Sequence, residues 1–251
     1  MEKSKHYISK LVLSILLFSI VPDVYSESPY KKTIYNAFVN REMYKWANVI
    51  RTIETTSSPV TVEQKLELIK LYYGYTAYLI NKKQVSTAEL FIEKAEEMIS
   101  EVIKLSPKNA AAYAFKGSFA GYRIGISKFK AIYLGSESTD NINKALEFDP
   151  QNIQAIIDKG NMLYYSPRLL GGDKNEALKF YLKGVRLFEK NADTDHNWLY
   201  LNLLTNIAMA YEKTDQPALA KLIYEKILHK EPNYLWVKDD LYPKFLAKNK
   251  Q

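Results

Sequence analysis

The sequence predicts an all-α protein: a superhelix of stacked helical hairpins, that is, a solenoid. Three observations point to this fold. Glycine and proline account for only 9 residues each of the 251, and strong helix formers are abundant. Prolines recur in closely similar settings, as expected of internal repeats. Within each repeat unit, apolar residues recur at the spacing of one helix face.

Residues 1–26 have the features of a secretory signal peptide. Three lysines accompany an apolar run of 11 residues, Leu11 to Val21, which is shorter than the roughly 20 residues of a transmembrane helix. The small residues Val24 and Ser26 predict cleavage between Ser26 and Glu27. The mature chain, 27–251, is then a single repeat domain, periplasmic or secreted. An uncleaved segment that anchors the domain to a membrane remains the alternative.

Three prolines mark the repeat units. The sequences around Pro107, Pro150 and Pro232 read SPKN, DPQN and EPNY, and Gly117 and Gly160 each follow the nearest of these prolines by ten residues. We expect both glycines to lie at close helix crossings, where a larger side chain would overpack the interface.

A second spacing gives the period. Gly74 lies 33 residues before Pro107, and Gly117 lies 33 residues before Pro150. The two segments are therefore predicted to be units of one design with a period of 43 residues.

The last unit is shorter and carries the clearest pattern. Small and large residues alternate along residues 201–234 and a proline closes the unit: Ala208, Tyr211, Ala220, Tyr224 and Pro232. This unit resembles a tetratricopeptide repeat of about 34 residues, and with longer helices or loops the resemblance extends over roughly residues 64–248. It implies paired helices whose first members line a concave binding face.

The remaining segments complete the stack. Residues 29–54 are expected to form an opening helical pair, and 234–248 a closing helix that covers the last apolar face. Between them, Pro167 and the sequence Gly171-Gly172-Asp173 predict an ordered loop, in which Asp173 and Glu176 both bind free amides of the next helix. A similar loop occurs in periplasmic repeat proteins associated with tripartite substrate-binding transporters, which is a weaker resemblance.

The chain lacks the residue patterns of an enzyme. It has no cysteine and only three histidines, and His6 falls within the predicted signal peptide. His196 and His229 have no companion residues at catalytic spacings. Neither a phosphate-binding glycine loop nor a calcium loop is present. We therefore expect no catalytic activity, no cofactor and no metal.

The net charge of +7 does not identify a partner. Lysines alternate with acidic residues along the predicted helices, as in IEKAEEMISEVIK, which is typical of solvated helix faces. The absence of a long basic run argues against nucleic-acid binding. We expect membrane contact only if the N-terminal segment is retained as an anchor.

A concave aromatic groove is the predicted site of binding. Tyrosine and asparagine suit recognition because they combine a rigid body with polar atoms. The side chains expected to line the groove are Tyr75, Tyr78, Tyr122, Asn161, Tyr164, Tyr165, Asn202 and Asn206. Several of these tyrosines could instead fill space between helices. The first hypothesis is an exported adaptor that binds a peptide, a protein or a small ligand; the alternative is an envelope assembly protein that binds through its outer surface.

Overall fold

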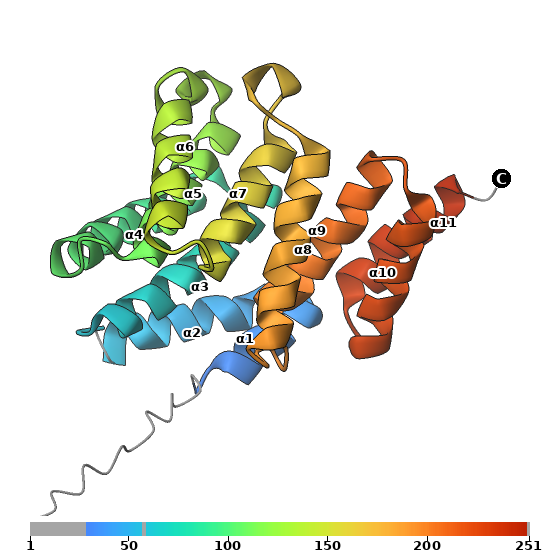
Figure 1. The fold of residues 1–251 in the computed structure, drawn as a ribbon. Helices are drawn as coiled ribbons and strands as arrows, with labels where there is room; N and C mark the ends of the chain where they lie inside the picture. Colours follow the sequence, from blue (N-terminus) through green and yellow to red (C-terminus); the bar gives the residue numbers. More distant parts are fainter. Residues whose placement is uncertain (1–28, 57–58, 250–251) are drawn as a thin grey trace, which may run out of the picture.

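The computed structural model describes residues 29–56 and 59–249, and within them the fold is all-helical, as predicted. Five antiparallel helical hairpins follow one another along the chain (Figure 1). The hairpin helices are α1 (Lys31–Val39) with α2 (Met43–Thr56), α3 (Val62–Asn81) with α4 (Val85–Leu105), α5 (Ala110–Ile126) with α6 (Ala131–Phe148), α7 (Ile153–Tyr165) with α8 (Lys174–Lys190), and α9 (Trp198–Lys213) with α10 (Pro217–Lys230). The predicted signal peptide lies outside the described residues.

Two of the recurring prolines, Pro107 and Pro150, lie in turns between hairpins, and Pro232 follows the last hairpin. Two residues after Pro107, the Asn109 side chain caps α5 by accepting a 2.9 Å hydrogen bond from the amide of Ala112. Asn152 stands in the same place after Pro150 and caps α7. An asparagine at this position accepts from one of the free amides of the first turn. The proline-x-asparagine pattern therefore marks where the third and fourth hairpins begin.

The two glycines predicted to lie at close crossings do so. A methyl group placed on Gly117 would lie 2.6 Å from Cγ1 of Ile142 and 2.7 Å from the carbonyl oxygen of Ser138, both on the partner helix α6. A methyl group on Gly160 would lie 2.5 Å from the ring of Tyr181 on α8. In each of these two hairpins, the absence of a side chain on the glycine allows the two helices to pack closely.

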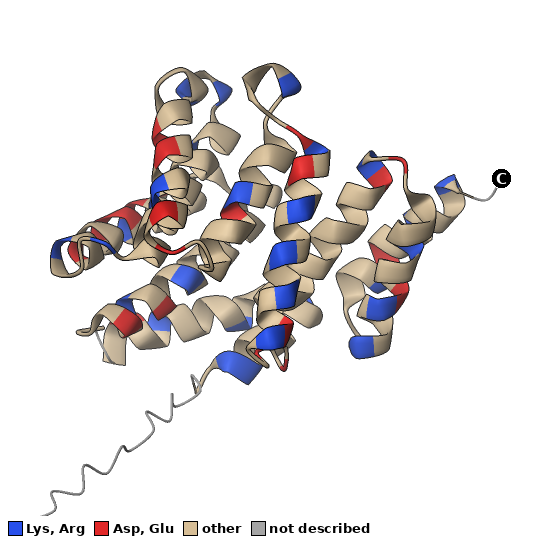
Figure 2. Cartoon of the chain, viewed as in Figure 1, with Lys and Arg blue, Asp and Glu red and all other residues tan. Residues whose placement is uncertain are grey.

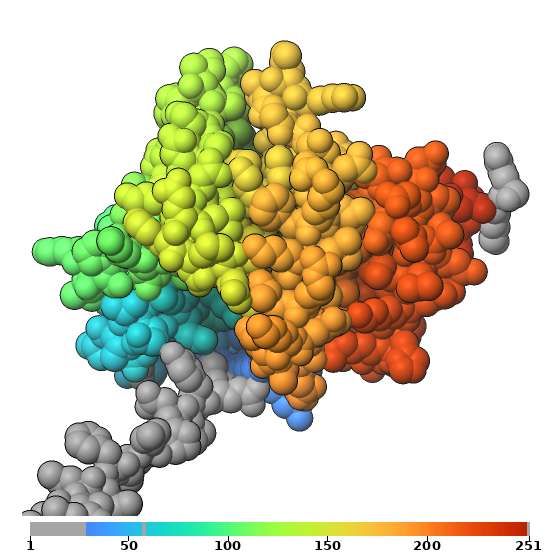
Figure 3. Space-filling model, viewed as in Figure 1, coloured from blue at the N-terminus to red at the C-terminus, as the bar shows by residue number. Residues whose placement is uncertain are grey.

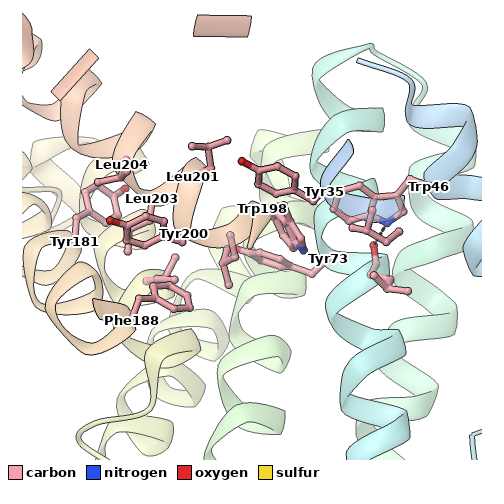
Figure 4. Packing of buried hydrophobic residues seen from close by; sticks show 14 of the residues in the cluster. Tyr35, Trp46, Tyr73, Tyr181, Phe188, Trp198, Tyr200, Leu201, Leu203 and Leu204 are labelled. Atoms are coloured by element: carbon pink, nitrogen blue, oxygen red, sulfur yellow. Dashed lines mark hydrogen bonds between the residues drawn. The ribbon is translucent and has the colours of Figure 1, made fainter. Parts of the chain in front are cut away.

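Gly74 does not share this role, although the 43-residue period aligns it with Gly117. The atoms nearest to its absent side chain belong to Trp46 on α2 and Trp198 on α9, and not to its own partner α4. The two indole rings meet edge to face, 5.0 Å apart. Figure 4 shows them together in the core. Gly74 therefore makes room for a contact between hairpins.

The first hairpin packs against the last part of the chain. Helix α1 contacts α9, and the ring of Phe38 lies 5.1 Å from that of Tyr234. The Tyr35 hydroxyl donates a 2.9 Å hydrogen bond to Glu231. Arg41 donates to the carbonyl of Leu235 at 2.9 Å and pairs with Asp240. The N-terminal hairpin and the C-terminal segment therefore hold each other in place.

Helical residues follow the last hairpin in the segment where a closing helix is expected. A six-residue π-helix, Trp236–Leu241, leads directly into α11 (Tyr242–Lys248). The rings of Tyr242 and Phe245 pack against Tyr224 of α10. Along the described part of the chain, none of the helices has the length and apolarity needed to cross a membrane.

Candidate ligand-binding surface

A hydrogen-bonded polar network joins helices of three different hairpins. The Tyr73 hydroxyl on α3 donates to the carboxylate of Asp158 on α7 at 2.9 Å. The Asn161 amide nitrogen donates to that same hydroxyl at 3.1 Å, while its carbonyl oxygen accepts from Tyr181 at 3.0 Å. Asn206 on α9 donates to the same Asn161 oxygen at 3.4 Å. Asn161 is thus the centre of a network that uses much of its hydrogen-bonding capacity within the protein.

Asp158 is the ionisable group of this network and is only 2% exposed. Burial raises the pKa of its carboxyl to about 6, against the opposing effect of the hydrogen bonds it accepts, which include one of 2.8 Å from Gln154. A buried carboxylate is costly unless it is hydrogen-bonded, and each donor around it reduces that cost. The network therefore holds a proton-binding group at the centre of the fold.

Five tyrosines gather around the network, and we call them the tyrosine cluster: Tyr73, Tyr122, Tyr164, Tyr165 and Tyr181. Tyr73 and Tyr122 stack with ring centroids 5.4 Å apart. Tyr164 meets Tyr165 edge to face at 4.9 Å and lies 6.3 Å from Tyr181. Aromatic pairs in these geometries attract each other beyond the effect of simple burial. The cluster is therefore an aromatic surface built from α3, α5, α7 and α8.

Tyr165 is the member that solvent reaches most. Its side chain is 67% exposed, whereas Tyr73 and Tyr181 are buried. Burial still raises the pKa of the Tyr165 phenol, because neighbouring helices surround part of the ring. Burial raises the pKa of Tyr164 to about 12, with a further contribution from Tyr165. Tyr164 and Tyr165 thus form the accessible edge of the cluster.

The structure brings together five of the eight residues predicted to line a groove. Tyr122, Asn161, Tyr164 and Tyr165 belong to the tyrosine cluster or bond directly to it. Asn206 is 6% exposed and takes part through its bond to Asn161.

The other three predicted residues lie elsewhere. Tyr75 and Tyr78 stack on each other at 5.8 Å, and Tyr75 packs edge to face on Phe91 of α4. They therefore fill space within their own hairpin region. Asn202 is half-buried in the first half of α9.

An open cleft of about 410 Å³ lies between α4, α5 and α6. Its charged lining residues face one another: Arg123 makes two hydrogen bonds to Glu96, at 2.7 and 2.8 Å, and Lys116 lies 3.9 Å from Glu137. Because these opposite charges already pair with one another, they are less available to bind a charged ligand in the cleft.

Two turns expose large apolar side chains, which the sequence patterns above do not single out. We call them the hairpin tips: residues 127–133, which contain a 3₁₀ turn (Lys128–Lys130) between α5 and α6, and residues 166–173, which contain a second (Arg168–Leu170) between α7 and α8. Figures 1 and 3 show both at the same end of the molecule, where they project from its body. The exposed fractions are 85% for Phe129, 87% for Ile132, 61% for Tyr133, 95% for Leu169 and 66% for Leu170.

The second tip is an ordered loop, as the sequence predicts. Gly171 has a left-handed backbone with φ of 84°, and a methyl group on Gly172 would lie 2.0 Å from the carbonyl oxygen of Ser166. The Asp173 carboxylate caps α8 by accepting from the amides of Asn175 and Glu176, at 2.8 and 3.1 Å. The expected capping by Asp173 is therefore confirmed.

The Glu176 carboxylate does not have the role expected of it. The spacing predicts that it binds back to a free amide of the same turn, but it pairs with Lys179.

No metal-binding group is apparent where the structure describes the chain. Its described histidines, aspartates and glutamates form no cluster of three or more that could hold an ion. His196 contacts Asp195 at 2.8 Å and packs on the ring of Tyr35 at 5.3 Å. His229 is exposed in the last turn of α10, where a cation is favourable for the helix.

Comparison with known proteins supports the fold. The chain has a tetratricopeptide-like fold. The HusA haemophore from Porphyromonas gingivalis superposes with a TM-score of 0.58 and 20% identity, over 73% of this chain and 90% of that one. A thermophilic TPR protein from Thermus thermophilus, TTC0263, gives a TM-score of 0.54 and 12% identity, over 86% and 97% of the two chains. No protein-family model and no curated protein sequence matches the chain.

The resemblance to tetratricopeptide repeats is therefore confirmed at the level of fold. Folds of this kind commonly serve as scaffolds whose concave surfaces bind other molecules. The names of the two similar structures say nothing of a transporter, so the association with tripartite transporters stays a prediction.

Proposed function

We propose that the protein is an exported, non-catalytic binding protein that takes its ligand at the exposed edge of the tyrosine cluster. The observation that carries this proposal is Tyr165, an aromatic side chain that is 67% exposed beside a rigid aromatic floor. Aromatic side chains of this kind dominate binding energetics because they bury much area and lose few rotamers.

The polar network supports the proposal by making the floor rigid. Tyr73 and Tyr181 are each held by hydrogen bonds as well as by ring contacts. A surface whose side chains are already fixed loses less conformational entropy when a ligand binds. In this proposal Asn161 and Asn206 position the cluster through these bonds, and Tyr164 and Tyr165 meet the ligand.

The test begins with identification of the ligand by cross-linking and mass spectrometry on the mature protein in its native envelope. Calorimetry then compares the parent with Tyr165→Ala and Tyr44→Ala. Tyr44 is the matched control, since it lies on α2 and is 62% exposed. Loss of Tyr165 should weaken binding by about 2 kcal/mol or more, the size of a hot-spot residue, and loss of Tyr44 should not. Equal affinities for all three folded proteins would rule out the cluster as the binding site.

A tetrapyrrole is a second candidate ligand, and the likeness to a haemophore favours it. The exposed ring of Tyr165, beside the partly buried ring of Tyr164, suits a flat, largely apolar molecule. Titration with hemin, followed by its visible absorption, should give saturable binding that Tyr165→Ala weakens and Tyr44→Ala leaves intact. Absorbance changes that match those of hemin in buffer would rule out a tetrapyrrole ligand. The proposal that another ligand binds at the tyrosine cluster would remain.

Export is part of the proposal and rests on residues 1–26. Sequencing of the N-terminus of the protein recovered from its host should begin at Glu27. An intact Met1 on membrane-bound material would support an anchored protein instead. Should the cluster prove inert, the alternative is an envelope assembly protein that binds through its outer surface.

A further inference from the structure

From the two hairpin tips we infer that the protein docks on an anionic membrane surface, with Phe129, Ile132, Leu169 and Leu170 inserted among the lipids. This contact is independent of residues 1–26 and of ligand binding at the tyrosine cluster. It would hold the folded domain against a bilayer by its own surface.

The first argument is the exposure of the apolar side chains. Phe129, Ile132 and Leu169 are each at least 85% exposed, so they contribute little to the core. Single exposed apolar residues are common, but large ones gathered at one end of a molecule mark an interaction site. The two tips close adjacent hairpins that pack on each other through α5, α6 and α7, so one surface can meet both.

The second argument is the contrast with neighbouring turns of the same kind. The turn from α3 to α4 reads Lys82-Lys83-Gln84, and the turn from α9 to α10 reads Thr214-Asp215-Gln216. All four turns join the first helix of a hairpin to the second, and the outer two have the polar residues usual for turns. The exposed apolar residues next to these outer turns, Val85 and Leu219, are only 40% and 43% exposed, whereas Phe129, Ile132 and Leu169 are each at least 85% exposed. The high exposure of large apolar side chains is therefore specific to the two tips among these four turns and is not a general property of such turns in this fold.

The third argument is charge, which favours a bilayer as the occupant. Residues 124–136 and 159–172 contain no aspartate or glutamate. Lys128, Lys130 and Arg168 are direct sequence neighbours of Phe129 and Leu169, and Figure 2 shows basic positions in both turns. Lys130 also lies 3.5 Å from Glu89. Apolar side chains flanked by lysine and arginine are the arrangement that binds at an anionic lipid interface.

The shape of the tips points the same way. They project from the body (Figure 3), whereas a docking site for a peptide or a helix is a groove. A bilayer needs no complementary shape, because its interface accommodates any apolar side chain that reaches it. Separate projections are therefore better suited to a lipid surface than to a folded partner.

The test is flotation of the mature chain with lipid vesicles. The chain from Glu27 keeps every residue that the structure describes, so the predicted signal peptide cannot contribute. Vesicles of phosphatidylcholine alone are compared with vesicles that also contain phosphatidylglycerol. We expect binding to the anionic vesicles and weaker binding to the neutral ones, because the cations act only on charged lipid.

Two pairs of substitutions separate the tips from exposed apolar residues in general. Phe129→Ser with Leu169→Ser should weaken binding at least about tenfold, a change that corresponds to about 1.4 kcal/mol. The matched control is Leu90→Ser with Leu222→Ser, at positions 53% and 60% exposed on α4 and α10, which should bind as the parent does. Circular dichroism melts confirm that each variant is folded.

A third pair tests the cations. Lys128→Gln with Arg168→Gln should lower binding to the anionic vesicles only, because both side chains stand beside the apolar tips.

Three results would overturn the inference. The first is a parent protein that floats with neither kind of vesicle. The second is a tip variant that binds as well as the parent, and the third is a control variant that loses binding equally. If the parent ignores vesicles but the tip variant loses a cross-linked protein, the tips are a protein-docking surface instead.

Discussion

The hydroxyl of Tyr73 on α3 donates a 2.9 Å hydrogen bond to the carboxylate of Asp158 on α7, although the two residues are 85 positions apart in the sequence. The α5–α6 hairpin lies between these helices along the chain. Both side chains are buried, so the space between α3 and α7 at this level is filled by the protein itself. A ligand that entered here would have to break these bonds, which is why the exposed edge at Tyr165 is the more accessible place.

Asp158 gives a prediction about pH. Its pKa of about 6 in the folded state exceeds the unfolded value of about 4, so the folded protein binds the proton more tightly. The resulting stabilisation is fully present below about pH 4 and is lost as the pH rises through 6, by roughly 3 kcal/mol in total. Asp158→Asn cannot titrate and should lack this change.

Denaturant unfolding at two pH values about 2.5 units apart, the lower near the unfolded pKa and the upper above the folded one, measures the effect. The parent should lose stability relative to Asp158→Asn as the pH rises, because all other titrating groups are shared and cancel. Parallel pH profiles for the two proteins would show that Asp158 is already solvated or paired.

A second prediction concerns the close helix crossings. Gly117→Ala should cost about 1–3 kcal/mol, since its methyl group would meet Ile142 and the backbone of Ser138. Gly135→Ala is the matched control, because it lies inside α6 with open space around it. It should stabilise the protein by about 0.5–1 kcal/mol through helix propensity. Urea denaturation distinguishes the two, and a shift of the same sign in both would contradict the packing role.

The cap of α8 gives a third prediction. Asp173→Ala removes the acceptor for two backbone amides, so it should lower the melting temperature by about 2–4 °C, the shift expected for loss of a typical cap. Asp173→Asn should restore much of the loss because asparagine also caps helices. Neither variant should change nucleotide binding, since we expect none. A nucleotide affinity that depended on Asp173 would make the loop a phosphate site.

Much of this fold could be predicted from residue patterns, because helix periodicity and turn chemistry are local. The recurring prolines marked the repeat units, and the small residues Gly117 and Gly160 marked the crossings. Gly74 could not be assigned, since its neighbours Trp46 and Trp198 reach it only when the superhelix winds. A repeat period carries no information on such winding.

The candidate site was predicted only in part for a related reason. Helical spacing placed Tyr164 and Tyr165 near Asn161, but nothing local joined Tyr73 to Asp158, which are 85 residues apart. The hairpin tips were missed because apolar residues near a helix end are usually part of the core. Their signal was the combination of apolar residues, lysines and no acid, as in KFKAIYL.

A fourth prediction concerns the contact between the two ends of the fold. Arg41→Ala removes the bonds to Leu235 and Asp240. The two side chains of the ion pair are 43% and 40% exposed, so its loss should cost less than about 1 kcal/mol. Phe38→Ala removes an apolar contact with Tyr234 and should cost more. Unfolding free energies of the two variants would show whether charge or packing dominates, and a larger loss for Arg41→Ala would contradict this order.

The same contact bears on how the protein unfolds. In an open array of repeats each unit touches only its neighbours, so the terminal units fray first and cooperativity is limited. Here Tyr35 and Arg41 connect the first hairpin to Glu231 and Leu235. Neither terminal unit can therefore unfold without breaking its contacts with the other. We expect a single unfolding transition, with amide protons of α1 exchanging no faster than those of α9. Non-covalent contacts between the first hairpin and the C-terminal segment thus couple the two ends of the repeat array.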